Sequence, residues 1–298
     1  MAYFDHIRRC NAHDLSRYRP WQIGGETVGW LRHDFVERLR GFPDVFKIAG
    51  ERIALAQLLA QPSDRTEALH SVGEALAEAG ALLPARGEPF PIAPRWGMEP
   101  FGEMDRRWVT HFGLPAYGVH LNGFVRKDRR YYMWLARRAK NKMTYPGLLD
   151  NLVAGGQPAR LGLRENMIKE ADEEAAIPPE LAARIQPVGQ VTYMMETEEG
   201  LKLDTLFNFD LELPPDFVPV NTDGEVEEFM LMPLSEVAAI VRESFDFKFN
   251  CSLVVIDFMI RHGFLTPDVE PAYVDLCTGL HAAFPITTEL GMARTIGA

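Results

Sequence analysis

Residues 155–177 constrain the fold of this 298-residue chain more than any other stretch. They open with two glycines, which suit a loop, and two prolines follow them, which stop a helix. The residues between these limits predict a helix over 162–175. Spacings of three and four residues place Glu170, Glu173 and Glu174 on one face of that helix.

These three glutamates repel one another, and a divalent cation would neutralise them. Carboxylate oxygens are hard ligands that suit Mg²⁺ or Mn²⁺. Glutamate also favours helices, and acidic runs are common on solvated helix faces. The spacing alone therefore leaves both a metal site and an exposed helix face open.

The same stretch resembles the Nudix box, which reads G, five residues, E, seven residues, and then R-E-U-x-E-E-x-G-U, where U is apolar. Counted back from Ile177, three of the pattern's acids fall on Glu170, Glu173 and Glu174. Gly155 falls on the opening glycine. The match identifies the chain as similar to the Nudix superfamily.

Three positions depart from the pattern. Leu161 stands where the first glutamate is expected, Lys169 replaces the arginine, and Ala176 replaces the late glycine. If Gly156 is the loop glycine instead, the loop is one residue short and Glu165 partly replaces the missing acid.

Flanking segments resemble one branch of the superfamily, the thiamine-pyrophosphokinase-related Nudix proteins. In that branch K-E-A-x-E-E-A replaces the common R-E-L-x-E-E-x-G, which matches the departures at Lys169 and Ala176. The similarity also covers residues 134–156, 223–237 and 247–265.

The resemblance implies an α/β fold, an α/β/α sandwich with a mixed sheet over residues 113–298, preceded by a smaller α+β domain over residues 1–112. Ser235 and Gly263 are expected to cap helices, and residues 82–94, rich in Pro and Gly, to form a loop. The elements that we expect along the chain are a strand at 26–31, helices at 33–42 and 65–80, paired strands at 117–126 and 131–139, a hairpin from 187–197 and 202–213, a strand at 225–233, and helices at 235–243 and 251–263.

Composition indicates an ordinary globular chain, with 47% hydrophobic and 24% charged residues. We expect no membrane helix, because no run approaches the ~18 apolar residues one requires, and no secretory signal. The net charge of −11, without a long basic stripe, argues against nucleic-acid binding. Cys10, Cys251 and Cys277 are scattered, which fits a reducing cytoplasm without a disulfide framework.

The resemblance implies metal ligands in the box. Glu170 and Glu174 are expected to bind Mg²⁺ directly, with Mn²⁺ as the alternative, and Glu173 to act as a further ligand or an orienting acid. A backbone carbonyl of Gly155 or Gly156 would complete the shell, because glycine permits close backbone approach. All three acids are therefore candidate catalytic residues.

Phosphate contacts are expected from basic residues near the box. Residues 113–195 carry 12 basic against 8 acidic residues, which suits an anionic substrate beside a metal. Arg137 and Lys142 are the candidates, and Lys169 is expected to pair with Glu173 or with a phosphate. A solvated base near a strand end is the alternative for each.

The general base is expected outside the box, and Glu227 is the candidate that we select. The wider set of candidates lies in two acidic segments and comprises Glu225, Glu227 and Glu228, then Glu196, Glu198 and Glu199. An exposed loop or strand-edge acid is the alternative for each of them.

Aromatic residues suggest where the organic half of a substrate would bind. The five tryptophans all lie in the first 134 residues, at Trp21, Trp30, Trp96, Trp108 and Trp134. Stacking on a heteroaromatic ligand would make the N-terminal domain the specificity module, with core packing as the alternative. His120 and His262 are expected to be structural.

Taken as a whole, the resemblance implies a Mg²⁺-dependent pyrophosphohydrolase that converts thiamine diphosphate or its oxidised analogues to the monophosphate and phosphate. The alternatives are a nucleoside-diphosphate-linked substrate, such as a dinucleotide or nucleotide sugar, and a non-catalytic module that senses a phosphorylated ligand. Residues 155–177 do not separate these, because the box handles only phosphates. A homodimer is expected by analogy with the superfamily.

Overall fold

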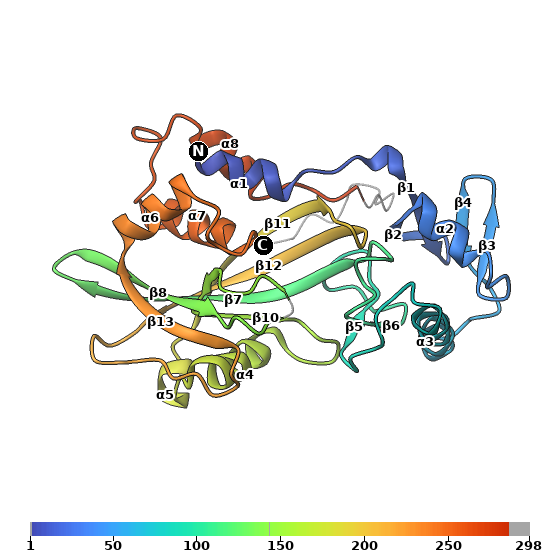
Figure 1. Ribbon diagram of the computed structural model, residues 1–298, viewed down its shortest axis with the longest axis horizontal. Coiled ribbons are helices and arrows are strands. Elements are labelled where there is room, and N and C mark those ends of the chain that lie inside the picture. Colours follow the sequence, from blue (N-terminus) through green and yellow to red (C-terminus); the bar gives the residue numbers. More distant parts are fainter. Residues whose placement is uncertain (1, 143, 286–298) are drawn as a thin grey trace, which may run out of the picture. The chain divides into compact units, whose positions relative to one another are not determined.

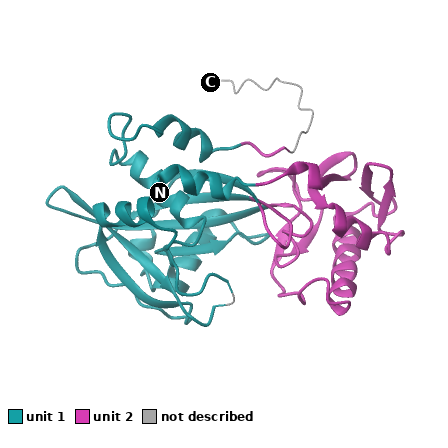
Figure 2. Ribbon diagram, turned by 45° about the horizontal axis from the view of Figure 1, so that its top comes forward, with its two compact units in different colours: residues 1–12, 116–195, 204–282 teal, residues 13–115, 196–203, 283–298 magenta. Residues whose placement is uncertain are grey.

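The computed structural model describes residues 2–142 and 144–285 (Figure 1). Their contacts divide them into two compact units (Figure 2). The described parts of unit 1 are residues 2–12, 116–142, 144–195 and 204–282, and those of unit 2 are residues 13–115, 196–203 and 283–285. The first residues of the chain thus fold with the unit that contains the acidic helix, and the long N-terminal segment of unit 2 ends at Pro115.

Unit 1 is built on a seven-stranded sheet. The strand order is β11-β12-β7-β8-β13, with β10 paired to β7 and β9 paired to β8. The strands are β7 (Pro115–Lys127), β8 (Arg130–Arg138), β9 (Leu149–Asn151), β10 (Val153–Gly156), β11 (Gln186–Glu196), β12 (Leu201–Glu212) and β13 (Val226–Pro233). Asp128 and Arg129 take the left-handed conformation, with φ of 51° and 61°, so β7 and β8 form the predicted hairpin.

Helices cover both faces of this sheet, which gives three layers (Figure 1). One face carries α4 (Leu163–Ala175) and α5 (Pro179–Ala182). The other face carries α1 (Tyr3–Cys10), α6 (Leu234–Glu243), α7 (Cys251–Arg261) and α8 (Tyr273–Gly279). The predicted α/β class is confirmed.

Each face of the sheet has its own hydrophobic core because successive strand residues point to opposite sides. In β7, Leu121 and Val125 pack with Ala171 of α4, whereas Phe124 packs with Phe258 of α7. The acidic helix therefore lies on one face, and the most deeply buried helix, α7, lies on the other.

Most of the predicted elements are confirmed, and one predicted cap is wrong. Ser235 does not cap α6, because the N-cap position belongs to Pro233, where strand β13 runs directly into the helix. Gly263 follows the C-cap residue of α7 with φ of 68°, as a helix stop should. The helix α4 ends at Ala175, and Ala176 follows with φ of 49°.

Unit 2 contains a four-stranded sheet of order β2-β1-β4-β3 and a two-stranded sheet, β5-β6. The predicted loop at 82–94 contains the short strand β5, because Phe90 pairs with Met104. The elements are η1 (Leu15–Arg17), β1 (Tyr18–Ile23), β2 (Glu26–Arg32), α2 (His33–Leu39), β3 (Phe46–Ala49), β4 (Arg52–Leu55), α3 (Pro62–Glu78), β5 (Pro89–Pro91) and β6 (Glu103–Asp105).

The core of unit 2 uses two of the five tryptophans. Trp21 and Trp108 are fully buried, and their indole N–H groups donate to the carbonyls of Phe112 and Leu83 at 2.9 and 2.8 Å. These two side chains pack the core rather than present a stacking surface. Across the described ranges, no helix is long and apolar enough to cross a membrane.

Candidate functional site

Two glutamates of α4 meet the backbone of strand β10. The Ala154 N–H donates a hydrogen bond to Glu174 Oε2 at 2.9 Å. The carboxyl of Glu170 lies against Gly155, where an added Cβ would stand 2.4 Å from Glu170 Cδ. A side chain at position 155 would displace the Glu170 carboxyl from this position, so the glycine permits the close approach. The structure thus brings together three residues that the sequence predicted for the site.

A second chain segment brings further carboxylates to Glu174. Carboxylate oxygens of Glu174, Asp223 and Glu225 all lie within 4.8 Å of one another. The turn before β13 holds Asp223 and Glu225, and the Thr222 hydroxyl on the same turn donates to the Glu173 carbonyl on α4. The site is therefore formed by one helix, one strand and one turn of unit 1.

The electrostatic environment of Glu174 is acidic. Burial raises the pKa of its carboxyl well above the usual value, and Asp150, Glu170 and Glu225 raise the pKa further. The hydrogen bond from Ala154 opposes this rise. Such a carboxyl binds protons tightly unless a cation replaces them, and its neighbours supply hard oxygen ligands. The donor set therefore fits a divalent cation.

Glu173 is oriented differently from its two neighbours. Its carboxylate Oε2 lies 2.5 Å from Lys169 Nζ, which is one of the two pairings that the sequence predicted for Lys169. Lys169 Nζ also lies 3.5 Å from Glu170 Oε1. Glu173 does not belong to the group that Glu174 forms with the turn. Its assignment as a ligand or orienting acid stays a prediction.

The predicted phosphate contacts and the predicted bases face one another across β8 and β13. Arg137 Nε lies 3.7 Å from Glu228 Oε2, and Lys142 forms an ion pair with Glu225. Glu227 pairs with Lys140, with 3.0 Å between Oε1 and Nζ. Arg137 and Lys142, which were predicted to bind phosphate, thus each pair with an acid that was a candidate for the general base.

The remaining base candidates lie in unit 2. The Glu196 carboxylate forms an ion pair with Arg17, and the Glu198 carbonyl accepts a hydrogen bond from Arg32 at 2.7 Å. Glu199 belongs to the same segment. The structure groups these acids with basic residues of unit 2.

Sequence reasoning missed Asp223. In the sequence, Asp223 stands out only as part of the Asp-Gly pair at 223–224, which predicts a turn and not a binding site. The side chain of Asp223 accepts from the Glu225 N–H at 2.8 Å, which closes that turn and directs both acids toward Glu174.

A second group of possible ligands lies beneath α7 and was also missed. Ligand atoms of His120, Asp150 and Cys251 lie within 4.8 Å of one another, and all three residues are buried. The Cys251 thiol donates to Asp150 Oδ1 at 2.6 Å, and Arg138 and Lys248 approach Asp150 Oδ2 at 2.8 and 3.5 Å. The group already contains two cations, so it does not fit a metal ion.

The pKa values of this second group reflect its internal pairing. Burial would raise the pKa of Asp150, but Lys248 and Arg138 outweigh burial and lower the pKa to about 2. Burial lowers the pKa of His120 to about 4, and its Nδ1 lies 2.8 Å from Asn151 Oδ1. His120 is therefore neutral near pH 7 and structural, as the sequence predicted.

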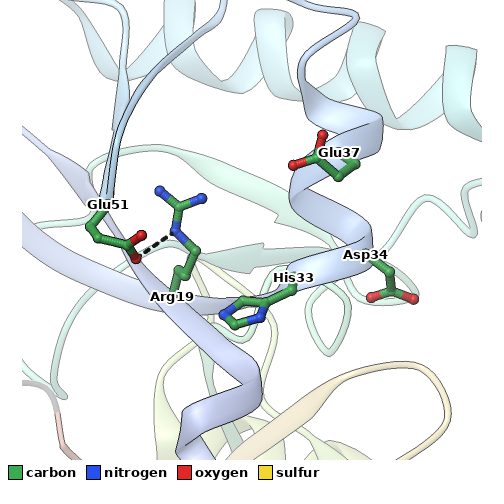
Figure 3. Close-up of a pocket in the computed structure, with 5 residues that line it drawn as sticks. All are labelled: Arg19, His33, Asp34, Glu37 and Glu51. Atoms are coloured by element: carbon green, nitrogen blue, oxygen red, sulfur yellow. Dashed lines mark ion pairs between the residues drawn. The ribbon is translucent and has the colours of Figure 1, made fainter.

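Unit 2 contains an open cavity of about 430 Å³ (Figure 3). One ion pair spans it, with 3.3 Å between Arg19 Nε and Glu51 Oε2. The lining residues are Arg19, His33, Asp34, Glu37 and Glu51. None of the predicted site residues lines this cavity. The lining residues are polar or charged, and no Phe, Tyr or Trp side chain is among them for a substrate ring to stack on.

Comparison with known proteins identifies relatives over most of the chain. Residues 2–116 match the model of a domain of unknown function, DUF4743. The chain is 40% identical over 286 residues to the Arabidopsis thaliana protein "Nudix hydrolase 20, chloroplastic", covering 92% of this chain and 76% of that relative. It is also 40% identical over 279 residues to "Nudix hydrolase 24, chloroplastic" of the same plant, with the same coverage.

Solved structures show a weaker likeness. The NUDIX domain of Shewanella oneidensis NrtR, in complex with ADP-ribose, is 15% identical and covers 51% of this chain and 90% of its own, with a TM-score of 0.39.

Proposed function

This chain belongs to the Nudix hydrolase family, and we propose that it hydrolyses thiamine diphosphate or its oxidised analogues to the monophosphate and phosphate. The observation that supports hydrolysis most is the group of carboxylates that Glu174 forms with Asp223 and Glu225, next to Glu170. The choice of substrate is supported by the resemblance of the flanking segments to the thiamine-pyrophosphokinase-related branch.

Nudix hydrolases generally use divalent cations, and we propose Mg²⁺ here, with Mn²⁺ able to replace it. Glu170 and Glu174 would hold the cation, with Glu173 and the Gly155 carbonyl in the supporting roles that the sequence predicts. When bound, the cation neutralises charge on the diphosphate oxygens. The chain contributes the carboxylates and the close backbone approach at Gly155.

The basic residues would bind the substrate's phosphates. Lys142 is the best placed, because its partner Glu225 belongs to the acidic group. Arg137 and Lys169 are the other proposed contacts, each at present paired with an acid. An incoming phosphate would compete with those acids for the bases.

Glu225 is a better candidate than Glu227 to accept a proton from the attacking water. Its carboxylate lies within 4.8 Å of Glu174, whereas Glu227 pairs with Lys140. With Lys142 turned to a phosphate, the Glu225 carboxylate beside Glu174 would take that proton. Glu227 stays a prediction for this role.

We propose that the N-terminal region binds the organic half of the substrate. The match of residues 2–116 to a domain model supports a separate domain there. Trp96 has 47% of its surface exposed, whereas Trp21 and Trp108 are in the core. Trp96→Ala should raise KM for an aromatic substrate and leave kcat unchanged.

We place the reaction in a reducing compartment, with a small-molecule diphosphate as the partner. All three cysteines are free thiols, which supports the predicted cytoplasm, although the two plant relatives are named chloroplastic. The acidic net charge of −11 supports the absence of a nucleic-acid partner. The predicted homodimer can be checked by light scattering after size exclusion.

Phosphate release from a small panel tests the proposed substrate. The panel is thiamine diphosphate, its oxo analogue, ADP-ribose, NADH and UDP-glucose, each with Mg²⁺ and with the Glu174→Gln variant as the control. For the nucleotide compounds, which release no free phosphate, a phosphatase added afterwards reports the products. We expect Glu174-dependent cleavage of the thiamine compounds.

The other outcomes separate the alternatives. Preferential cleavage of a nucleotide compound would keep the hydrolase and overturn the thiamine substrate. No cleavage, with ligand-induced thermal stabilisation still present, would overturn hydrolysis in favour of a ligand sensor.

A further inference from the structure

The loop between β10 and α4 is held from inside by two buried amide side chains. Gln157 is 1% exposed and Asn166 is 0% exposed. Asn166 Nδ2 donates to the Gly156 carbonyl at 2.9 Å and to Gln157 Oε1 at 3.0 Å. Gln157 Nε2 donates to the carbonyls of Leu161 and Pro158 at 2.7 and 3.3 Å. The amide pair thus satisfies three carbonyls of one short loop.

Asn166 belongs to the same helix stripe as the acids of the site. It precedes Glu170 by one turn, and Glu170 precedes Glu174 by another, so all three side chains project from one face of α4. Going along α4, the three side chains contact successively earlier residues of β10. Asn166 contacts Gly156, Glu170 contacts Gly155, and Glu174 contacts Ala154. A displacement at the Asn166 end would therefore move both carboxylates relative to the strand.

We propose that Asn166 and Gln157 are positioning residues that set the register between α4 and β10 and so hold Glu170 and Glu174 in a cation-binding arrangement. This inference rests on the cation site of the proposed function and deepens it. Neither amide is assigned a contact with the cation or the substrate. Both act through the loop carbonyls and the strand backbone.

The amide pair also explains how the loop closes with Leu161 in place of an acid. Leu161 takes part through its backbone carbonyl, which any residue supplies. Gln157 satisfies this partly buried carbonyl and so avoids the cost of leaving it without a partner. A neutral amide also adds no further negative charge beside Glu170, whose neighbour Glu174 already has a raised pKa.

Titration calorimetry with Mn²⁺ tests the inference without relying on activity. The variants are Asn166→Leu, which removes both bonds, and the milder Gln157→Met, which removes the donors to the loop carbonyls. The matched control is Asn208→Leu, because Asn208 is also fully buried and donates to Asp257 Oδ2 at 2.9 Å beneath α7. Urea unfolding measures the stability of each variant.

We expect the Kd for Mn²⁺ to rise roughly 10-fold or more in both loop variants, the range typical for groups that support metal ligands. Asn208→Leu should lose comparable stability and keep its Kd within about twofold of the wild type, because it lies outside the loop. An unchanged Kd in Gln157→Met and Asn166→Leu, or an equal rise in Asn208→Leu, would overturn the positioning role.

The same titration separates this inference from the proposed function. If the wild type binds Mn²⁺ through Glu174 but hydrolyses no compound of the panel, the proposed function is overturned. The positioning role is then still tested by the Kd values of the variants. A wild-type protein that binds no Mn²⁺ overturns both.

Discussion

Asp150 and Glu174 are two carboxylates of the same unit with opposite electrostatic environments. Each belongs to a group of three possible ligands whose atoms lie within 4.8 Å of one another. Lys248 and Arg138 outweigh burial and lower the pKa of Asp150 to about 2, whereas burial and acidic neighbours raise the pKa of Glu174. Close packing of ligand atoms therefore does not by itself indicate a metal site.

The difference lies in the charge that each group already contains. Asp150 faces the start of α7 and receives two cations and a thiol proton. Glu174 lies on α4, on the opposite face of the sheet, where the two nearest possible ligands are acids and the base Lys142 pairs with one of them, Glu225. We infer that the first group stabilises the fold and the second recruits a cation.

The largest effect is expected from Glu174→Gln. The amide keeps the shape and can still accept from Ala154, but it removes the charge that a cation needs. Turnover should fall by about three orders of magnitude, since a metal contributes several kcal/mol to charge stabilisation. Steady-state kinetics at saturating Mg²⁺ measures this effect, with urea unfolding to show that the variant is folded. A kcat within threefold of wild type would remove Glu174 from the site.

Asp150→Asn should instead destabilise the protein, because it leaves Arg138 and Lys248 without their acid. Breaking a buried ion pair costs about 3–5 kcal/mol of unfolding free energy. The exposed pair of Arg126 and Glu212 provides the control, and Glu212→Gln should cost less than about 1 kcal/mol. Urea unfolding of the two variants compares them, and equal losses would contradict the contrast between the two groups.

His120 should make the stability fall in mild acid. Its pKa is about 4 when folded and 6.5 in the unfolded reference, so the unfolded chain binds more protons between these values. The contribution of neutral His120 to the free energy of unfolding is complete above pH 6.5. It decreases as the pH falls toward 4, by about 3 kcal/mol in total. His120→Gln should flatten this slope in urea unfolding at several pH values. The exposed His281 is the control, and a slope that survives in His120→Gln but not in His281→Gln would refute the assignment.

The smallest effect concerns the end of α4. Ala176 occupies the left-handed conformation with φ of 49°, which glycine adopts more readily. Ala176→Gly should stabilise the protein by about 0.5–1 kcal/mol. Ala183 ends α5 with φ of −60°, so Ala183→Gly should not stabilise it. Thermal unfolding of both variants distinguishes a local conformational strain from a general effect of glycine.

The sequence predicts much of the fold and part of the site. Helical spacing predicts that Glu170 and Glu174 share a face, and the hairpin from β7 to β8 follows from alternating residues around a polar turn. The pairing of Arg137 with Glu228 depends on the register between β8 and β13, which no local pattern encodes. Asp223 reaches the site only because its turn docks on α4 through Thr222.

The sequence also does not predict the hydrogen bond between the two amide side chains. Gln157 and Asn166 are nine residues apart, and each alone resembles an ordinary polar residue of a loop or helix. Their role becomes visible only when burial and the loop carbonyls are known. Local patterns thus predict residues on one element, and contacts between elements have to be observed.

Mn²⁺ binding by titration calorimetry tests the contrast between the two groups most directly. The three proteins to compare are the wild type, Glu174→Gln and Cys251→Ser, which changes the second group while retaining a hydrogen-bond donor to Asp150. We predict that the wild type and Cys251→Ser bind Mn²⁺ with similar affinity and that Glu174→Gln loses binding. Binding that survives in Glu174→Gln and disappears in Cys251→Ser would place the cation at the wrong group and contradict the account.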